Sequence, residues 1–270
     1  NIPIIEQPKA PVLFLTSANT DISTISAFIK TKAGNNWKGR LRALNLISLN
    51  HPSQIDHYLA TTAANTKVII VRLLGGRSHW QYGLESLVRW KEDDNNKILI
   101  VLSGTKENEN ELNEIGSIDQ DLSSKFCELF RTGGMSNIST FFYWVNKIYK
   151  GKEKIEVQNI NTSFLDDPYI WDWKIESYPK VGVIHYSSSF QADDIALARS
   201  INTELRNNRL SPRCIWVSSL KSKRVQEEVI KLFQKEELSS VIISTSFSTV
   251  KFDENYTNNV IWDLLDIPIF

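Results

Sequence analysis

Residues 68–87 read Val68-Ile-Ile-Val-Arg-Leu-Leu-Gly-Gly-Arg-Ser-His-Trp-Gln-Tyr-Gly-Leu-Glu-Ser-Leu87. The segment 67–74 is β-branched or leucine at nearly every position, which is typical of a strand covered on both faces by helices. A glycine pair and a polar turn then lead into a helix. In an open α/β sheet, ligands bind outside the carboxyl ends of the strands. The stretch therefore predicts a parallel α/β unit, with residues 75–82 at the edge where a binding site is expected.

The residues of this turn suit an acidic, planar and partly apolar ligand. Gly75 and Gly76 allow close approach of a partner or a positive φ, and Arg77 offers a rigid fork of donors for a carboxylate or phosphate. Three ring side chains with flat faces and hydrogen-bonding tips follow, namely His79, Trp80 and Tyr82. The alternative is that the glycines serve the turn alone and that Arg77 is a solvated or structural charge.

Strands and helices alternate before and after this stretch. Strands are predicted at residues 12–16, 41–47, 67–74 and 98–102, and helices at 21–32, from Pro52 onward and at 82–90. A helical stretch follows from Glu109 to Tyr149, broken at residues 132–134. The alternation indicates a parallel sheet with helices on both sides.

The plan is repeated in the second part of the chain. Strands are predicted at 181–186, 214–217 and 241–244, with helices at 193–206 and 222–235. We expect a first α/β domain at 1–150 with a helical extension, a linker at 151–180, and a second α/β domain at 181–270. The fold class is α/β, with two successive parallel-sheet, Rossmann- or flavodoxin-like units. Because Tyr169, Trp171 and Trp173 would be unfavourable in water, we expect them to pin the linker to a domain.

Hydroxyl-rich turns follow the strands of the second domain, at 186–189, 218–221 and 245–247. Ser218, Ser219 and Lys221 could hold a carboxylate, so we predict them as secondary ligand contacts. The same turns could equally be helix caps.

Composition excludes binding by bulk charge. The chain has 31 basic and 31 acidic residues among 270, so it has no net field for nucleic acid or an anionic membrane. No apolar run approaches the ~20 residues of a membrane span. Cys127 and Cys214 lie far apart without a CxxC motif, as expected for reduced thiols, and we expect a cytoplasmic protein.

Familiar catalytic and nucleotide-binding motifs are missing from the sequence. It contains no G-x-x-x-x-G-K-[ST] phosphate loop, no G-x-G-x-x-G, no G-x-S-x-G and no H-E-x-x-H. The chain also begins without Met and ends on Ile267-Pro-Ile-Phe270, which suggests a strand cut short. We therefore expect part of a longer polypeptide, inactive by itself, and we name no catalytic residue and no metal ligand within it.

The segment 71–85 resembles the amino-terminal part of the large subunits of the CobN/magnesium chelatase family. Its Gly75-Gly76-Arg77 core and Tyr82-Gly83 match the family's turn, whereas His79 and Gln81 stand where an aromatic residue and a proline are expected. Further segments are similar in order and spacing. They are Val12–Asp21, Asn50-His51-Pro52, Val181–Tyr186, Val217–Lys221, Ile242–Phe247 and Leu264–Phe270.

This resemblance implies a tetrapyrrole-binding subunit of an ATP-dependent cobaltochelatase. Such a subunit inserts Co(II), a substrate, into hydrogenobyrinic acid a,c-diamide during cobalamin biosynthesis, while separate AAA-type subunits use ATP and Mg. We expect residues 1–270 to form an amino-terminal head in which Arg77 pairs with a peripheral carboxylate and His79, Trp80 or Tyr82 lies against the macrocycle. The alternatives are a magnesium chelatase large subunit, acting on protoporphyrin, and a non-catalytic two-domain binding or scaffold module.

Overall fold

The computed structural model describes residues 3–151, 155–244 and 261–270. The chain divides into two compact units, residues 1–163 (unit 1) and 164–270 (unit 2). The division falls within the segment 151–180 that the sequence marks as a linker. Residues 155, 157 and 160 pack against the core of unit 1, while Tyr169, Trp171 and Trp173 pack in unit 2.

Unit 1 is built on a four-stranded sheet with the strand order β2-β1-β3-β4, in which every pair is parallel. This arrangement confirms the parallel α/β unit predicted from residues 68–87. The strands are β1 (Val12–Thr16), β2 (Leu41–Asn45), β3 (Val68–Leu73) and β4 (Ile98–Ser103). The helices are α1 (Asn19–Lys30), α2 (Pro52–Thr61), α3 (Gln81–Glu92), α4 (Glu109–Asn113), α5 (Gln120–Thr132) and α6 (Met135–Tyr149), with short 3-10 turns at Asn35–Trp37, Leu46–Leu49 and Arg77–Trp80.

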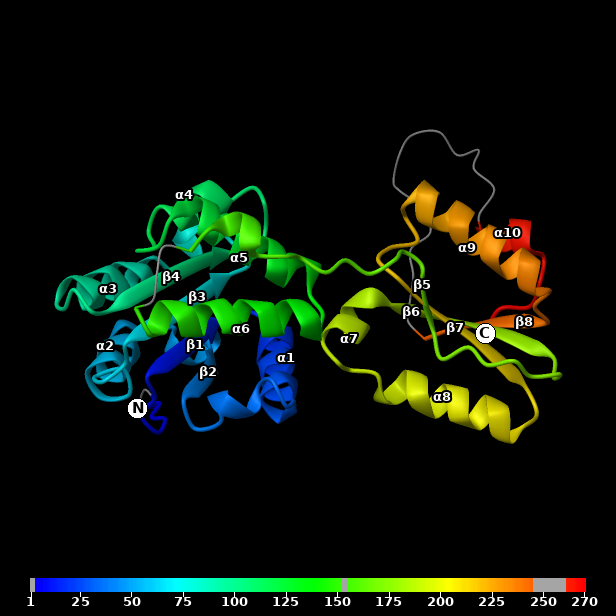
Figure 1. Cartoon of the computed structure of the whole chain (residues 1–270), viewed down its shortest axis with the longest axis horizontal. Helices are drawn as coiled ribbons and strands as arrows, with labels where there is room; N and C mark the ends of the chain where they lie inside the picture. The colour runs from blue at the N-terminus through cyan, green and yellow to red at the C-terminus, as the bar shows by residue number, and fades with distance from the viewer. Residues whose placement is uncertain (1–2, 152–154, 245–260) are drawn as a thin grey trace. The chain divides into compact units, whose positions relative to one another are not determined.

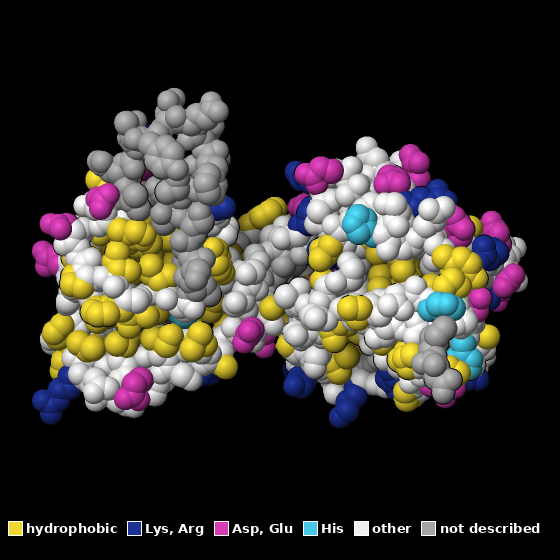
Figure 2. Space-filling view, turned by 180° about the vertical axis from the view of Figure 1, so that it is seen from behind, with side chains coloured by type: hydrophobic (Ala, Val, Ile, Leu, Met, Phe, Trp, Pro, Cys, Tyr) yellow, Lys and Arg dark blue, Asp and Glu magenta, His cyan; other side chains and the backbone are white. Residues whose placement is uncertain are grey.

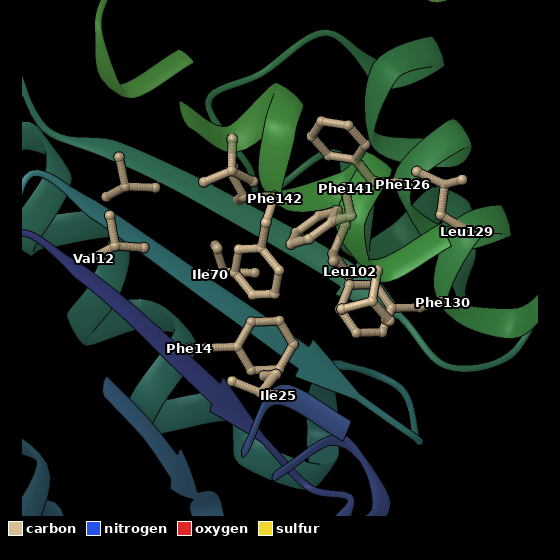
Figure 3. Packing of buried hydrophobic residues seen from close by; sticks show 14 of the residues in the cluster. Val12, Phe14, Ile25, Ile70, Leu102, Phe126, Leu129, Phe130, Phe141 and Phe142 are labelled. Carbon is tan, nitrogen blue, oxygen red and sulfur yellow. The ribbon is translucent and has the colours of Figure 1, made fainter. Parts of the chain in front are cut away.

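Helices cover both faces of the sheet (Figure 1). Alternate residues of β1 and β3 enter two separate cores, as strand geometry requires. Phe14 and Ile70 pack with α1, α5 and α6, where Phe126, Phe141 and Phe142 form a layer of aromatic rings (Figure 3). The opposite core packs β1 and β3 against α2 and α3.

The helical stretch after β4 has one break more than the sequence predicts. The expected break at residues 132–134 is present, because Gly133 and Gly134 both have positive φ, which favours glycine. A second break separates α4 from α5. There the carboxylate of Asp119 accepts hydrogen bonds from the backbone N–H groups of Asp121 and Leu122 and so caps the start of α5.

Unit 2 contains a mixed sheet with the strand order β5-β7-β6-β8. The strands β6 (Lys180–Tyr186), β7 (Ser211–Val217) and β8 (Ser240–Ile243) are parallel, whereas β5 (Tyr169–Trp171) runs antiparallel to β7. The sequence predicts parallel strands alone, because β5 is only three residues long and lies in the expected linker. The helices of unit 2 are α7 (Ser187–Gln191), α8 (Ala196–Asn207), α9 (Lys223–Glu236) and α10 (Ile261–Leu265).

Two other expectations for unit 2 need correction. The predicted helix at 193–206 begins only at Ala196 and is preceded by the short α7. The segment 264–270, expected as a strand, starts within α10, and only its last residues, 268–270, pair with β8, in parallel and through backbone hydrogen bonds. The linker aromatics do pack as predicted: the indole N–H of Trp173 donates to the carbonyl of Cys214 at 2.8 Å, and Trp171 lies edge-on against Trp216.

None of the described helices combines the length and the apolarity that crossing a bilayer requires. On the face shown in Figure 2, basic and acidic side chains are interspersed on both units, as the equal numbers of the two charges lead one to expect.

Candidate functional site

The turn predicted as the binding site lies at the carboxyl edge of the sheet in unit 1. It leaves β3 beside the ends of β1 and β4, because the Leu74 N–H donates to Ser17 Oγ at 2.9 Å and the Gly104 N–H donates to the Leu73 carbonyl at 2.6 Å. Residues from three adjacent strand ends therefore meet at this edge, as expected for a ligand site in an α/β sheet.

The two glycines of the turn leave room for neighbouring side chains of the protein. A Cβ on Gly75 would lie 2.4 Å from Nδ1 of His79, so the imidazole occupies the space beside this glycine. A Cβ on Gly76 would lie 3.0 Å from Oδ1 of Asn108, just before α4. Neither glycine has a positive φ. The glycine pair thus lets the turn pack against neighbouring side chains. The sequence alone did not distinguish this role from the close approach of a ligand.

Among the residues predicted at this turn, Arg77 carries the positive charge, and its side chain makes only a weak contact with the protein. It is 50% exposed, and its ion pair with Glu85 is long, with 3.9 Å between the charged atoms. A guanidinium group has five N–H donors, so most of those on Arg77 remain available to an incoming carboxylate. His79 is also exposed.

Trp80 and Tyr82 are engaged by the protein. Trp80 is only 9% exposed, its indole N–H donates to the Leu49 carbonyl at 2.9 Å, and its ring fills the space beside Gly83. It therefore supports the turn from inside.

The Tyr82 hydroxyl donates to the Asp56 carboxylate at 2.9 Å, at the junction of α2 and α3. This hydrogen bond raises the pKa of Tyr82. Of the four side chains predicted at the turn, Arg77 and His79 are exposed, Tyr82 is exposed with its hydroxyl group engaged by Asp56, and Trp80 is buried and supports the turn.

The second predicted group lies after β7 in unit 2. Ser218 binds the carboxylate of Asp167 through both its backbone N–H and its hydroxyl group. Ser219 Oγ accepts the N–H of Lys221 at 3.1 Å, and the Lys221 side chain is exposed. Of the other two hydroxyl-rich turns, residues 187–189 lie in α7, and the turn at 245–247 falls outside the described residues.

A buried ion pair beside the candidate site was not predicted. Arg72 on β3 and Asp21 on α1 are both almost completely buried, with 2.8 Å between their charged atoms. Thr16 donates to the same carboxylate at 2.6 Å, and the guanidinium group lies over the ring of Phe130. The pair ties the end of β3 to the helix that follows β1. The one signal in the sequence is the arginine that interrupts the apolar strand.

The two cysteines are not reactive, and the described residues contain no group suited to a metal ion. Burial raises the pKa of Cys127 to about 11 and that of Cys214 further, so both thiols stay protonated and are poor nucleophiles. No group of three or more His, Cys, Asp or Glu side chains suited to a metal ion occurs in the part of the chain that the structure describes. The charged group that the turn exposes is the Arg77 guanidinium group.

Comparison with known proteins identifies the family. Residues 127–270 match the family model described as CobN/Magnesium Chelatase, which is more than half of the chain. The "Aerobic cobaltochelatase subunit CobN" of a Sinorhizobium species is 32% identical over 148 residues, or 55% of this chain and 11% of that protein. The protein of the same name from Pseudomonas aeruginosa is 24% identical over 218 residues, or 77% of this chain and 17% of that protein.

A solved structure has the same fold. The "Catalytic Subunit of Cobaltochelatase from Mycobacterium tuberculosis" superposes with a TM-score of 0.64 at 14% identity, covering 87% of this chain and 18% of that chain. The chain spans less than a fifth of each of these relatives. On the match of its family model, the chain belongs to the CobN/magnesium chelatase family.

Proposed function

We propose that residues 1–270 form the amino-terminal head of the tetrapyrrole-binding subunit of an ATP-dependent cobaltochelatase. In this proposal the whole subunit inserts Co(II), as a substrate, into hydrogenobyrinic acid a,c-diamide, and separate AAA-type subunits hydrolyse ATP with Mg. The observation that carries the proposal is that the two curated relatives are both named as cobaltochelatase subunits. The magnesium branch remains the second candidate, because the family model covers both.

The part we assign to this chain is to bind the edge of the macrocycle. Arg77 stands at the carboxyl edge of the sheet with a half-exposed guanidinium group and one long ion pair. A peripheral carboxylate of the tetrapyrrole would satisfy its free donors with a bidentate pair. His79 would lie beside the same ligand, and Trp80, fixed from inside, would hold the turn in shape. The groups that take up the pyrrole protons and deliver the metal are expected in the remainder of the subunit.

An insertion assay tests the function. The full-length subunit, combined with its ATPase partners, is supplied with Co(II) and hydrogenobyrinic acid a,c-diamide, and in parallel with Mg²⁺ and protoporphyrin. We expect ATP-dependent cobalt insertion into the corrinoid. Magnesium insertion into protoporphyrin would assign the other branch, and activity with neither pair would contradict a chelatase function.

The same assay tests the role of Arg77 in binding the tetrapyrrole. Charge-assisted hydrogen bonds contribute about 1.5 to 3 kcal/mol each, so Arg77→Ala is expected to raise the KM for the tetrapyrrole at least tenfold. Arg199→Ala, which removes an exposed arginine from α8, is the matched control and should leave KM unchanged. An unchanged KM for Arg77→Ala, together with lower thermal stability, would show that this arginine is structural.

A further inference from the structure

The turn after β7 binds a carboxylate from a distant part of the chain. The Ser218 N–H donates to Oδ1 of Asp167 at 3.1 Å, and the Ser218 hydroxyl donates to Oδ2 at 2.5 Å. Arg224, in the first turn of α9, approaches the same Oδ2 at 3.5 Å and donates to the Asp167 carbonyl at 3.2 Å. Residues 218–224 therefore hold both oxygens of one carboxylate with an amide, a hydroxyl group and a guanidinium group. Donors of these types suit a charged carboxylate.

Asp167 is the polar attachment of its own segment. Among the described residues, the hydrogen bonds and ion pairs that join residues 164–168 to the rest of unit 2 are those of Asp167. Phe164 and Asp166 on either side of Leu165 are exposed. The segment thus depends on one side chain for its polar contacts with the turn.

The turn keeps donors that Asp167 does not use. The Arg224 side chain is 66% exposed, and its ion pair with Asp167 is at the long end of the range. Lys221 is exposed in the same turn. These cations lie at the carboxyl end of a parallel strand, the edge at which α/β sheets bind their ligands. Lys221 and Arg224 carry two positive charges, and the single Asp167 carboxylate neutralises only one of them. Positive charge therefore remains to bind an acidic ligand.

We infer that Asp167 is an internal occupant of a carboxylate-binding turn at residues 218–224, and that a ligand with several carboxylates binds this turn by displacing the segment 164–168. A tethered competitor has an effective concentration on the order of millimolar. A ligand with one carboxylate and no other contact, such as acetate, therefore does not compete, whereas a polycarboxylate that also reaches Arg224 and Lys221 does. Identifying this ligand as the tetrapyrrole rests on the proposed function.

Calorimetry with benzene-1,2,4,5-tetracarboxylate tests the inference without a tetrapyrrole. The full-length subunit is compared with Asp167→Asn, which removes the competing charge but keeps an oxygen to accept the Ser218 N–H. We expect the variant to bind the probe at least fivefold more tightly than the wild type, and the double variant Asp167→Asn/Arg224→Ala to lose this gain. Thermal unfolding verifies that both variants are folded.

The neighbouring carboxylate provides the matched control. Asp166 is the neighbour of Asp167, and its side chain is exposed. Asp166→Asn removes the same charge, and it should leave the affinity for the probe unchanged. Equal affinities in the wild type and Asp167→Asn, or an equal gain in both Asn variants, would overturn the inference. Binding of this probe involves neither Arg77 nor a macrocycle. A gain in affinity confined to Asp167→Asn would therefore support the inference about residues 218–224 even if Arg77→Ala left tetrapyrrole binding intact and the proposed function failed.

Discussion

Arg72 and Asp21 bring opposite charges into the interior of unit 1, 51 residues apart in the chain. A buried charge is tolerated when it is paired and hydrogen-bonded. Here the carboxylate takes two contacts from the guanidinium group and one from Thr16. This pair holds the strand end from which the candidate turn leaves, so it positions the turn without contacting a ligand.

Replacing Asp21 with Asn should therefore destabilise the protein strongly, because it leaves the Arg72 charge buried without a partner. Breaking a buried pair in this way costs about 3 to 5 kcal/mol, measured as the free energy of unfolding in urea. Lys231→Ala, which removes the exposed ion pair with Glu228, is the control and should have no measurable effect. Equal stability of Asp21→Asn and the wild type would refute a structural role for the pair.

The stability of unit 2 should depend on pH because of His185. Its side chain is 3% exposed on β6, Nδ1 lies 2.6 Å from Ser244 Oγ, and burial lowers the pKa to about 4. The unfolded chain, with an ordinary pKa near 6.5, binds the proton more readily than the folded chain. The stabilisation is therefore complete above pH 6.5 and is lost as the pH falls toward 4.

Between pH 7.5 and pH 5, this residue should account for about 1 to 2 kcal/mol of lost stability. His185→Phe keeps a ring against Trp216, whose centroid lies 4.6 Å from that of the histidine, and removes the titrating group. Its free energy of unfolding should fall less steeply with acid than that of the wild type. Identical slopes would show that His185 does not titrate differently in the folded chain.

At the scale of elements, the start of α3 is fixed by one tryptophan and one glycine. A Cβ on Gly83 would lie 2.2 Å from the Trp80 ring, which cannot move away because it is buried and hydrogen-bonded to Leu49. Gly83→Ala should therefore destabilise the protein by about 1 to 3 kcal/mol, as overpacking does, despite the better helix propensity of alanine.

Gly75→Ala is the matched comparison. Its Cβ meets the imidazole of His79, which is exposed and can swing away. Thermal unfolding should show a smaller loss for this variant than for Gly83→Ala. A loss as large in Gly75→Ala would mean that His79 is as firmly held as Trp80.

Local sequence patterns predicted most elements but not the contacts between them. The strand at 12–16, the central strand at 68–73 and the break at Gly133-Gly134 follow from apolar runs and glycines, which are local signals. β5 escaped prediction because three residues are too few to show a period. The location of the turn at 75–82 was predictable, because an apolar run followed by a glycine pair is also a local signal. The pairing of Asp21 with Arg72 and of Asp167 with Ser218 was not, since each joins residues 51 positions apart.

At the scale of the whole molecule, the chain forms two α/β units and spans only part of the relatives that it matches. It spans 11% and 17% of two curated relatives and 18% of a solved subunit. Each unit has an arginine beyond the carboxyl end of a parallel strand, Arg77 after β3 in unit 1 and Arg224 at the start of α9 in unit 2. Both side chains are exposed, but Arg77 has only a long ion pair with Glu85, whereas Arg224 contacts both the carboxylate and the backbone carbonyl of Asp167.

We propose that the turn at Gly75-Gly76-Arg77 contacts the tetrapyrrole, and an equilibrium titration measures this contact. The tryptophan fluorescence of the full-length subunit is followed while hydrogenobyrinic acid a,c-diamide is added, for the wild type, Arg77→Ala and Arg199→Ala. We expect saturable quenching with a Kd at least tenfold higher for Arg77→Ala than for the other two proteins. The same Kd in all three would contradict this proposal and would leave residues 1–270 as a scaffold for a site elsewhere in the subunit.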